Sequence, residues 1–188
     1  MLFPKQEAAN AANSNHSDSA VIKINLNTNY LNNIGTNWSN KIANHTWKVG
    51  GNTFENIRDV VMSTAYRNEI TSPAENTTYA AKIGLMYASD YGYAAAPSAW
   101  TTPLYNNSGN DYRLSSVTSV NWMYMGLYDW TIARRSDSSN FAFDVYHVGY
   151  VALNDVSYIS AVRPVLYLAS ETAYAGGTGT AGSPILIK

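Results

Sequence analysis

The chain of 188 residues contains no cysteine. Disulfides, thiolate metal sites and cysteine nucleophiles are therefore excluded. Stability has to come from a packed core, which 46% hydrophobic residues can supply at this length. The length itself suits one compact domain better than two.

Charge and long apolar runs are also scarce. Only 13% of the residues are charged and the net charge is -1, so the chain has no phosphate-seeking face and nucleic-acid binding is disfavoured. No run approaches the roughly 18 apolar residues of a membrane span. Met1 to Ala20 lacks the apolar centre of a signal peptide. We expect either a cytoplasmic protein or one whose targeting segment is absent from this chain.

Asparagine, serine, threonine, glycine and tyrosine are abundant, with 15 Tyr and 5 Trp. This uncharged polar and aromatic mixture is common in extracellular binding surfaces, where tyrosine supplies contact area at low entropic cost. A strand-rich fold with many Asn turns explains the same composition equally well. Both interpretations stay open at this point.

The pattern of apolar residues predicts an α+β domain at 20–188, after residues 1–19, which are expected to be a polar tail or the end of a truncated helix. The clearest helix spans 53–70, where Phe54, Ile57, Val60 and Val61 recur at helical spacing. A second, short helix is expected from Ser89 to Tyr93, and Pro97 to Ser116 is expected to be a long polar loop. Strands are predicted at Ala20–Leu26, Lys82–Tyr87, 120–125, 128–133, 141–153, 158–168 and 185–187.

Trp130 to Leu168 mixes two kinds of residue. Apolar or small residues suited to a buried strand framework are Trp130, Ile132, Val145, Gly149, Val151, Val156 and Val162. Between them stand aromatic, amide and charged residues of no single chemistry, as in a recognition surface: Arg135, Asp137, Asn140, Phe141, Phe143, Tyr146, His147, Tyr150, Asn154 and Tyr158.

Catalytic and metal-binding motifs are missing. The three histidines are scattered, there is no G-x-S-x-G elbow, and Gly176–Thr180 lacks the lysine and helix of a phosphate loop. Asp137, Asp144, Asn154 and Asp155 match no calcium-loop spacing, which favours solvated turn residues over a calcium site. The sequence therefore predicts neither an enzyme nor a cofactor.

Arg163–Pro164 indicates a strand start, bulge or edge, because proline cannot donate to a β-ladder. We expect Arg163 to anchor a carboxylate beneath the sheet, Asp129 or Glu171. Contact with a ligand is the less favoured alternative for this arginine.

Four blocks together resemble a known family: HTWKVGGNTFENI (45–57), KIGLMYASDYGYA (82–94), NWMYMGLYDWTI (121–132) and AVRPVLYLASETAYAGGTGTAGSPILI (161–187). Over roughly residues 40–188 the chain resembles pilin-like surface proteins of gut Firmicutes with a C-type lectin fold. Some of these are similar to the variable proteins of diversity-generating retroelements. The N-terminus lacks an apolar pilin helix, and the absence of cysteine opposes the formylglycine-generating branch of the fold.

The resemblance implies a C-type lectin-like fold in which strands from both termini pair, with Ala20–Leu26 beside Val162–Leu168 or Ile185–Ile187. It also implies that the mixed set above, with Leu153 added, is hypervariable and displayed for ligand binding. The implied protein is a non-enzymatic binding domain on a bacterial or phage surface. Its partner would be a protein or glycan on another cell or surface.

Two alternatives stay open. One is a minor pilin or surface-layer subunit whose exposed aromatic residues make subunit contacts. The other is a calcium-dependent glycan-binding lectin.

Overall fold

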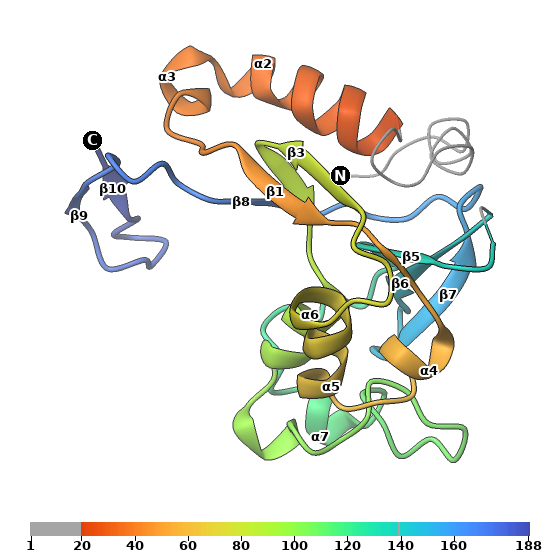
Figure 1. The fold of residues 1–188 in the computed structure, drawn as a ribbon. Coiled ribbons are helices and arrows are strands. Elements are labelled where there is room, and N and C mark those ends of the chain that lie inside the picture. Colours follow the sequence, from red (N-terminus) through yellow and green to blue (C-terminus); the bar gives the residue numbers. More distant parts are fainter. Residues whose placement is uncertain (1–19, 139) are drawn as a thin grey trace.

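The computed structural model describes residues 20–138 and 140–188 (Figure 1). The predicted tail at 1–19 lies outside the described residues. Within them, no helix is long and apolar enough to cross a membrane.

The first described element is a helix rather than the predicted strand at Ala20–Leu26. Helix η2 (Ala20–Tyr30) has the wide turn of a π-helix and continues into α2 (Leu31–Ile34), and the short α3 (Thr36–Ser39) follows Gly35. Leu26, Tyr30 and Leu31 pack on one core at helical spacing. The side chain of Asn27 bonds both backbone groups of Ile83, accepting from its N–H and donating to its carbonyl.

The long helix predicted at 53–70 is broken into three pieces. These are α4 (Phe54–Ile57), α5 (Met62–Tyr66) and η3 (Arg67–Thr71). The break falls at Val61, whose backbone is extended and bridges to Pro103. The Leu104 N–H donates to the Val60 carbonyl at 2.9 Å, so the 97–116 loop takes a hydrogen bond that a continuous helix would need.

The largest sheet has the strand order β2–β5–β6–β7. Strands β5 (Asp129–Arg135), β6 (Phe141–Val145) and β7 (Val151–Asp155) form an antiparallel meander, and β2 (Gly51–Asn52) lies parallel to β5. Three two-stranded antiparallel sheets pair β1 (His45–Lys48) with β3 (Thr78–Ala81), β4 (Ile83–Leu85) with β8 (Pro164–Leu166), and β9 (Tyr174–Gly176) with β10 (Leu186–Ile187). Mainly antiparallel strands with separate helices make this an α+β fold.

Several predicted elements are confirmed. Strand β4 lies within 82–87, β5 overlaps 128–133, β10 lies within 185–187, and α6 (Ala88–Tyr93) matches the short helix. The Pro97–Ser116 stretch is mainly loop, with η4 (Pro97–Ala99) at its start and α7 (Ser115–Thr118) at its end. The run 141–153 is two strands joined by a turn, and only β8 forms within 158–168.

Two expectations about strands are wrong. The run 120–125 is a turn, because Asn121 Oδ1 accepts the Met123 N–H at 2.9 Å and closes an Asn turn. The strands of the two termini do not pair as expected either. Ala20–Leu26 is helical, β8 pairs with β4, and β10 pairs with β9.

The four-stranded sheet lies between two hydrophobic cores. Phe143, Val145 and Val151 belong to a core shared with α5 and α6, whereas Trp130, Ile132 and Ala142 belong to a core around Trp47 and Leu26. The predicted inward valines Val145, Val151, Val156 and Val162 are all buried. Because both faces of the sheet are covered, binding groups can be presented only at its ends and edges.

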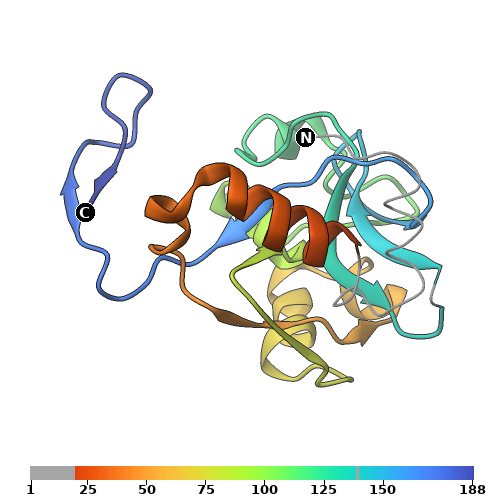
Figure 2. The same cartoon turned by 90° about the horizontal axis from the view of Figure 1, so that it is seen from above.

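The β9–β10 hairpin projects as an arm away from the rest of the fold (Figures 1 and 2). Its base is closed by reciprocal backbone hydrogen bonds between Ala173 and Lys188 at 3.1 and 3.0 Å. Tyr174, Ile185 and Leu186 are all exposed on it.

Candidate ligand-binding surface

Arginine and aromatic side chains alternate in a continuous row across the ends of the four-stranded sheet. We call it the arginine–aromatic row, and its members in spatial order are Phe141, Arg135, Phe54, Arg58, Tyr105, Arg113, Tyr150 and Tyr146, with Tyr128 and His147 at its end. All are half-buried except His147, which is exposed. The row gathers residues from α4, β5, β6, the 104–114 loop and the turn between β6 and β7.

Guanidinium groups lie over neighbouring rings along the first half of the row. Arg135 Cζ is 5.0 Å from the ring centroid of Phe54 and 6.0 Å from that of Phe141. Arg58 lies 4.2 Å from the Phe54 centroid and 3.9 Å from that of Tyr105. Such cation–π contacts contribute about 0.5–1 kcal/mol each at exposed sites and fix the planes of the rings.

Arg113 and four rings form the second half. Its Cζ lies 4.4 Å from the Tyr150 centroid and 5.1 Å from the Tyr105 centroid. Tyr146 stacks on Tyr150 with 5.0 Å between centroids and 21° between planes. Tyr128 and His147 then contact Tyr146, at 4.6 and 4.7 Å. The pKa of Tyr128 is raised to about 12, mainly by a hydrogen bond with Tyr146 and to a lesser extent by burial.

Each arginine of the row is paired with an aspartate close by in sequence. Arg58 Nε donates to Asp59 Oδ1 at 2.9 Å, and Arg113 Nη2 donates to Asp111 Oδ2 at 2.8 Å. Arg135 Nη2 donates to Asp137 Oδ2 at 2.9 Å, and this pairing raises the pKa of Arg135 and lowers that of Asp137. Each aspartate neutralises the charge of its arginine, so the row offers polar and aromatic contact surface without a net charge.

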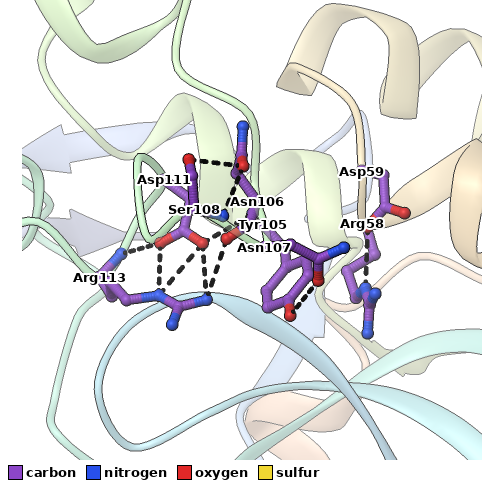
Figure 3. Close-up of polar contacts among 8 residues, drawn as sticks. All are labelled: Arg58, Asp59, Tyr105, Asn106, Asn107, Ser108, Asp111 and Arg113. Atoms are coloured by element: carbon purple, nitrogen blue, oxygen red, sulfur yellow. Dashed lines mark hydrogen bonds and ion pairs between the residues drawn. The ribbon is translucent and has the colours of Figure 1, made fainter.

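Asp111 builds the loop that carries Tyr105 and Arg113 (Figure 3). Its fully buried carboxylate accepts the backbone N–H groups of Asn106 and Arg113 at 2.7 and 2.9 Å, as well as the Arg113 side chain. A charged acceptor for two loop N–H groups stabilises this turn without regular secondary structure. The Arg113 guanidinium is thereby held in place against Tyr150.

The turn between β6 and β7 depends on Gly149, whose φ is 108°. A Cβ there would lie 2.6 Å from Thr118 Cγ2 and 2.8 Å from the Tyr112 carbonyl oxygen. Tyr91 anchors the turn from below by donating its hydroxyl to the Gly149 carbonyl at 2.7 Å. The turn thus presents Tyr146, His147 and Tyr150 outward.

A pocket of about 300 Å³ opens beside the end of the row. Its lining residues are Tyr128, Tyr146, Asn154, Tyr158, Ile159 and Ser160. Asn154 connects this pocket to the fully buried Asp144, donating its Nδ2–H to Asp144 Oδ2 at 2.6 Å. Burial raises the pKa of Asp144 to about 7, although the hydrogen bond from Asn154 lowers it.

The structure divides the predicted binding residues into groups. Phe141, Arg135 and Asp137 lie at one end of the β5–β6 hairpin, near exposed Asn140, whereas Tyr146, His147 and Tyr150 lie at the other. Asn154 and Tyr158 line the pocket, and Leu153 is half-buried against the core of α5 and α6.

Phe143 is not a displayed residue. It is fully buried in the core shared with α5 and α6, with the ring of Phe54 edge-on to it at 6.5 Å between centroids. Phe141 and Phe143 are two positions apart on one strand and therefore share a face, but Phe141 lies at the strand end and is only half-buried. The sequence prediction for Phe143 is wrong.

Sequence reasoning missed the members contributed from outside 130–168: Phe54, Arg58, Tyr105, Arg113 and Tyr128. The one available signal was the repeated placement of arginine next to aspartate, at 58–59, 111–113 and 135–137.

The expected carboxylate anchor of Arg163 is confirmed. Its Nη2 donates to Asp129 Oδ2 at 2.7 Å and to the Met123 carbonyl at 2.8 Å. Burial nevertheless raises the pKa of Asp129 to about 6. This arginine fixes the start of β5 beside β8, which is a structural role.

Across 20–138 and 140–188, no cluster of three or more His, Cys, Asp or Glu residues is placed to hold a metal ion. Of the four oxygen-bearing residues considered for calcium, Asp144 and Asn154 bond each other, Asp137 pairs with Arg135, and Asp155 accepts the Ser157 N–H at 2.8 Å.

Comparison with known proteins gives no family assignment. No protein-family model matches the chain, and searches of curated proteins and of solved structures find no match.

Proposed function

We propose that this protein is a non-enzymatic ligand-binding domain displayed on a bacterial or phage surface. The observation that carries the proposal is the arginine–aromatic row. Partly exposed tyrosine, phenylalanine and arginine are the residue types that dominate binding energy at protein interfaces. The stacking and ion pairs described above hold their side chains before any ligand arrives, which lowers the entropic cost of binding.

The similarity of four sequence blocks to C-type-lectin-fold surface proteins supports the same proposal. In that interpretation the fold is C-type lectin-like and the positions that vary are those on the hairpin ends, Arg135 to Phe141 and Tyr146 to Tyr150, with Asn154 and Tyr158. Phe143 is excluded from this set, because its ring supports the core. A buried framework beneath an exposed aromatic row tolerates such replacement without loss of the fold.

A binding screen with matched variants tests the proposal. The labelled protein is applied to a glycan array and to intact cells of gut bacteria, and the Tyr146→Ala/Tyr150→Ala double variant is compared with Tyr174→Ala on the β9–β10 arm. We expect the double variant to abolish binding with nearly unchanged melting temperature, and Tyr174→Ala to bind normally. Equal binding by the double variant and the wild type would exclude the row as the recognition surface.

One observation favours a structural subunit as the second candidate function. The arm exposes Tyr174, Ile185 and Leu186, and an apolar groove of about 500 Å³ lies on the body, lined by Tyr30, Ile34, Trp38, Ile42, Leu166 and Leu168. Sedimentation of the protein alone decides between the two. Concentration-dependent self-association that Tyr174→Ala removes supports the subunit, whereas a monomer at all concentrations opposes it.

The calcium-dependent lectin alternative is tested by the same glycan array. Loss of signal in chelator, together with heat released on calcium titration, would favour it. An unchanged array signal in chelator would remove it.

A further inference from the structure

The pocket beside the row has perpendicular aromatic walls. The rings of Tyr128 and Tyr146 meet at 73° with 4.6 Å between centroids, and Tyr158 and Ile159 line the pocket from the segment after β7. The two tyrosines supply aromatic surface to the wall of the pocket. Aromatic rings attract cations through the ring quadrupole.

The pocket and the residue behind it contain unused acceptors. Ser160 Oγ in the lining, and Asp144 Oδ1 behind Asn154, are buried without a hydrogen-bond partner among the described residues. Asn154 gives its Nδ2 to Asp144 Oδ2, so its amide oxygen is left as the group to offer a ligand. Buried polar atoms without partners cost free energy, which a ligand with matching donors recovers.

No cation neutralises the carboxyl group behind the pocket. None of the six lining residues is cationic. Asp144 is hydrogen bonded to Asn154 of the lining, and the charge of Asp129 disfavours the ionised form of Asp144, which a bound cation would favour. Asp129 is already paired with Arg163, and His147 lies against the outer rings rather than in the lining. Asp144 is therefore a buried carboxylate that has an amide donor but no cationic partner.

We propose that this pocket binds a primary alkylammonium group, as carried by a lysine side chain of a partner or by a free amine. Its N–H donors match the acceptors of the lining, Ser160 Oγ and Asn154 Oδ1, and the Asp144 carboxyl group bonded to Asn154 supplies the opposite charge. Its methylene chain packs on the rings of Tyr128 and Tyr146. A neutral sugar satisfies the hydroxyl and the amide but leaves the carboxylate uncompensated. This inference rests on the proposed function, for which it names the chemistry of one recognised group.

The test is an NMR titration of the isotope-labelled full chain with n-butylammonium, with n-butanol as the neutral control. We expect saturable shifts at the amides of Tyr128, Asn154 and Ser160, and binding of butanol weaker by about tenfold or more. Equal binding of butanol and butylammonium would overturn the proposal. Nα-acetyl-lysinamide forms a third arm: tighter binding than butylammonium indicates a protein partner, and equal binding indicates a free amine.

Two variants locate the site. Asp144→Asn removes the charge at constant shape and is expected to weaken butylammonium binding by about tenfold. Asp155→Asn, which makes the same change in net charge on the neighbouring strand β7, is expected to leave it unchanged. Ser160→Ala removes one acceptor without changing the charge, and we expect the affinity for butylammonium to fall several-fold. Unchanged affinity in a folded Asp144→Asn protein, or in Ser160→Ala if Asp144→Asn does not fold, overturns the assignment.

Failure of this inference and failure of the proposed function give different results. Arg113→Ala, far along the row, is expected to weaken partner binding while butylammonium still binds. If the protein binds an outside partner but not butylammonium, only the pocket assignment is wrong. If butylammonium binds but no screen finds an outside partner, the proposed function is wrong and the pocket assignment stands.

Discussion

The guanidinium of Arg113 lies over the ring of Tyr150, 4.4 Å from its centroid, and so connects a loop without regular structure to the turn between β6 and β7. The contact exists because Asp111 holds the guanidinium with a buried carboxylate. Two residues that are distant in sequence thereby share one surface. The geometry of the row depends on Asp111, which itself is not exposed to a ligand.

Replacing Asp111 with alanine is expected to destabilise the protein by about 3 kcal/mol, because removal of one member of a buried ion pair leaves Arg113 and two loop N–H groups without an acceptor. Urea unfolding followed by tryptophan fluorescence measures the change. Asp59→Ala is the matched control, since it breaks the more exposed pair with Arg58 and is expected to cost under about 1 kcal/mol. Equal effects would show that the loop does not depend on Asp111.

Phe143→Ala and Phe141→Ala distinguish core from surface on one strand. We expect Phe143→Ala to cost about 3–5 kcal/mol, because the ring is fully buried. Phe141→Ala is expected to cost about 1 kcal/mol or less, since its ring is only half-buried at the strand end. The free energy of unfolding of each variant is the measurement, and the reverse order would place Phe143 on the surface.

Gly149→Ala is expected to destabilise the β6–β7 turn by about 2 kcal/mol or more, because an alanine there meets both a positive φ and the Tyr112 carbonyl. Gly109→Ala separates the two causes, since Gly109 also has a positive φ but open space around it. Gly109→Ala is expected to lower the free energy of unfolding by less, because only the backbone strain of a positive φ remains. If Gly149→Ala unfolds at the wild-type urea concentration, the turn geometry described here is wrong.

Stability is expected to fall as the pH rises from about 4 to about 7. Burial raises the pKa of Glu69 from 4.5 and of Asp144 from 3.8, each to about 7, and that of Asp129 from 3.8 to about 6. The folded state therefore binds more protons than the unfolded chain in this window, and raising the pH favours unfolding. The contribution is fully present below pH 4 and lost above pH 7.

Urea midpoints at pH 5 and pH 8 measure this dependence, and we expect the higher midpoint at pH 5. Asp144→Asn removes one of the three groups and is expected to reduce the difference between the two urea midpoints. Asp137→Asn, an exposed carboxylate paired with Arg135, serves as the control and is expected to leave the difference intact. A higher midpoint at pH 8 for the wild type would contradict the prediction.

Local patterns predicted some elements because the information lay within a few residues. Strand β4, helix α6 and the buried valines 145, 151, 156 and 162 followed from apolar runs whose spacing the structure keeps. The Ala20–Leu26 strand and the 53–70 helix failed for a different reason. In the first, Leu26 packs on the core together with Tyr30 and Leu31, at a spacing that belongs to a helix. In the second, the backbone N–H of Leu104, from a loop distant in sequence, donates to the Val60 carbonyl.

The sequence by itself determined that this protein is cysteine-free and α+β, and it placed Arg135, Tyr146 and Tyr150 in the mixed segment 130–168. Only the tertiary structure decided which aromatic residues are displayed. Residues on one strand are buried or displayed according to what covers them, so Phe143 is fully buried whereas Phe141 at the strand end is only half-buried. Distant segments became neighbours because a buried aspartate and ring stacking, not sequence proximity, fix Tyr105, Arg113 and Tyr150 against one another.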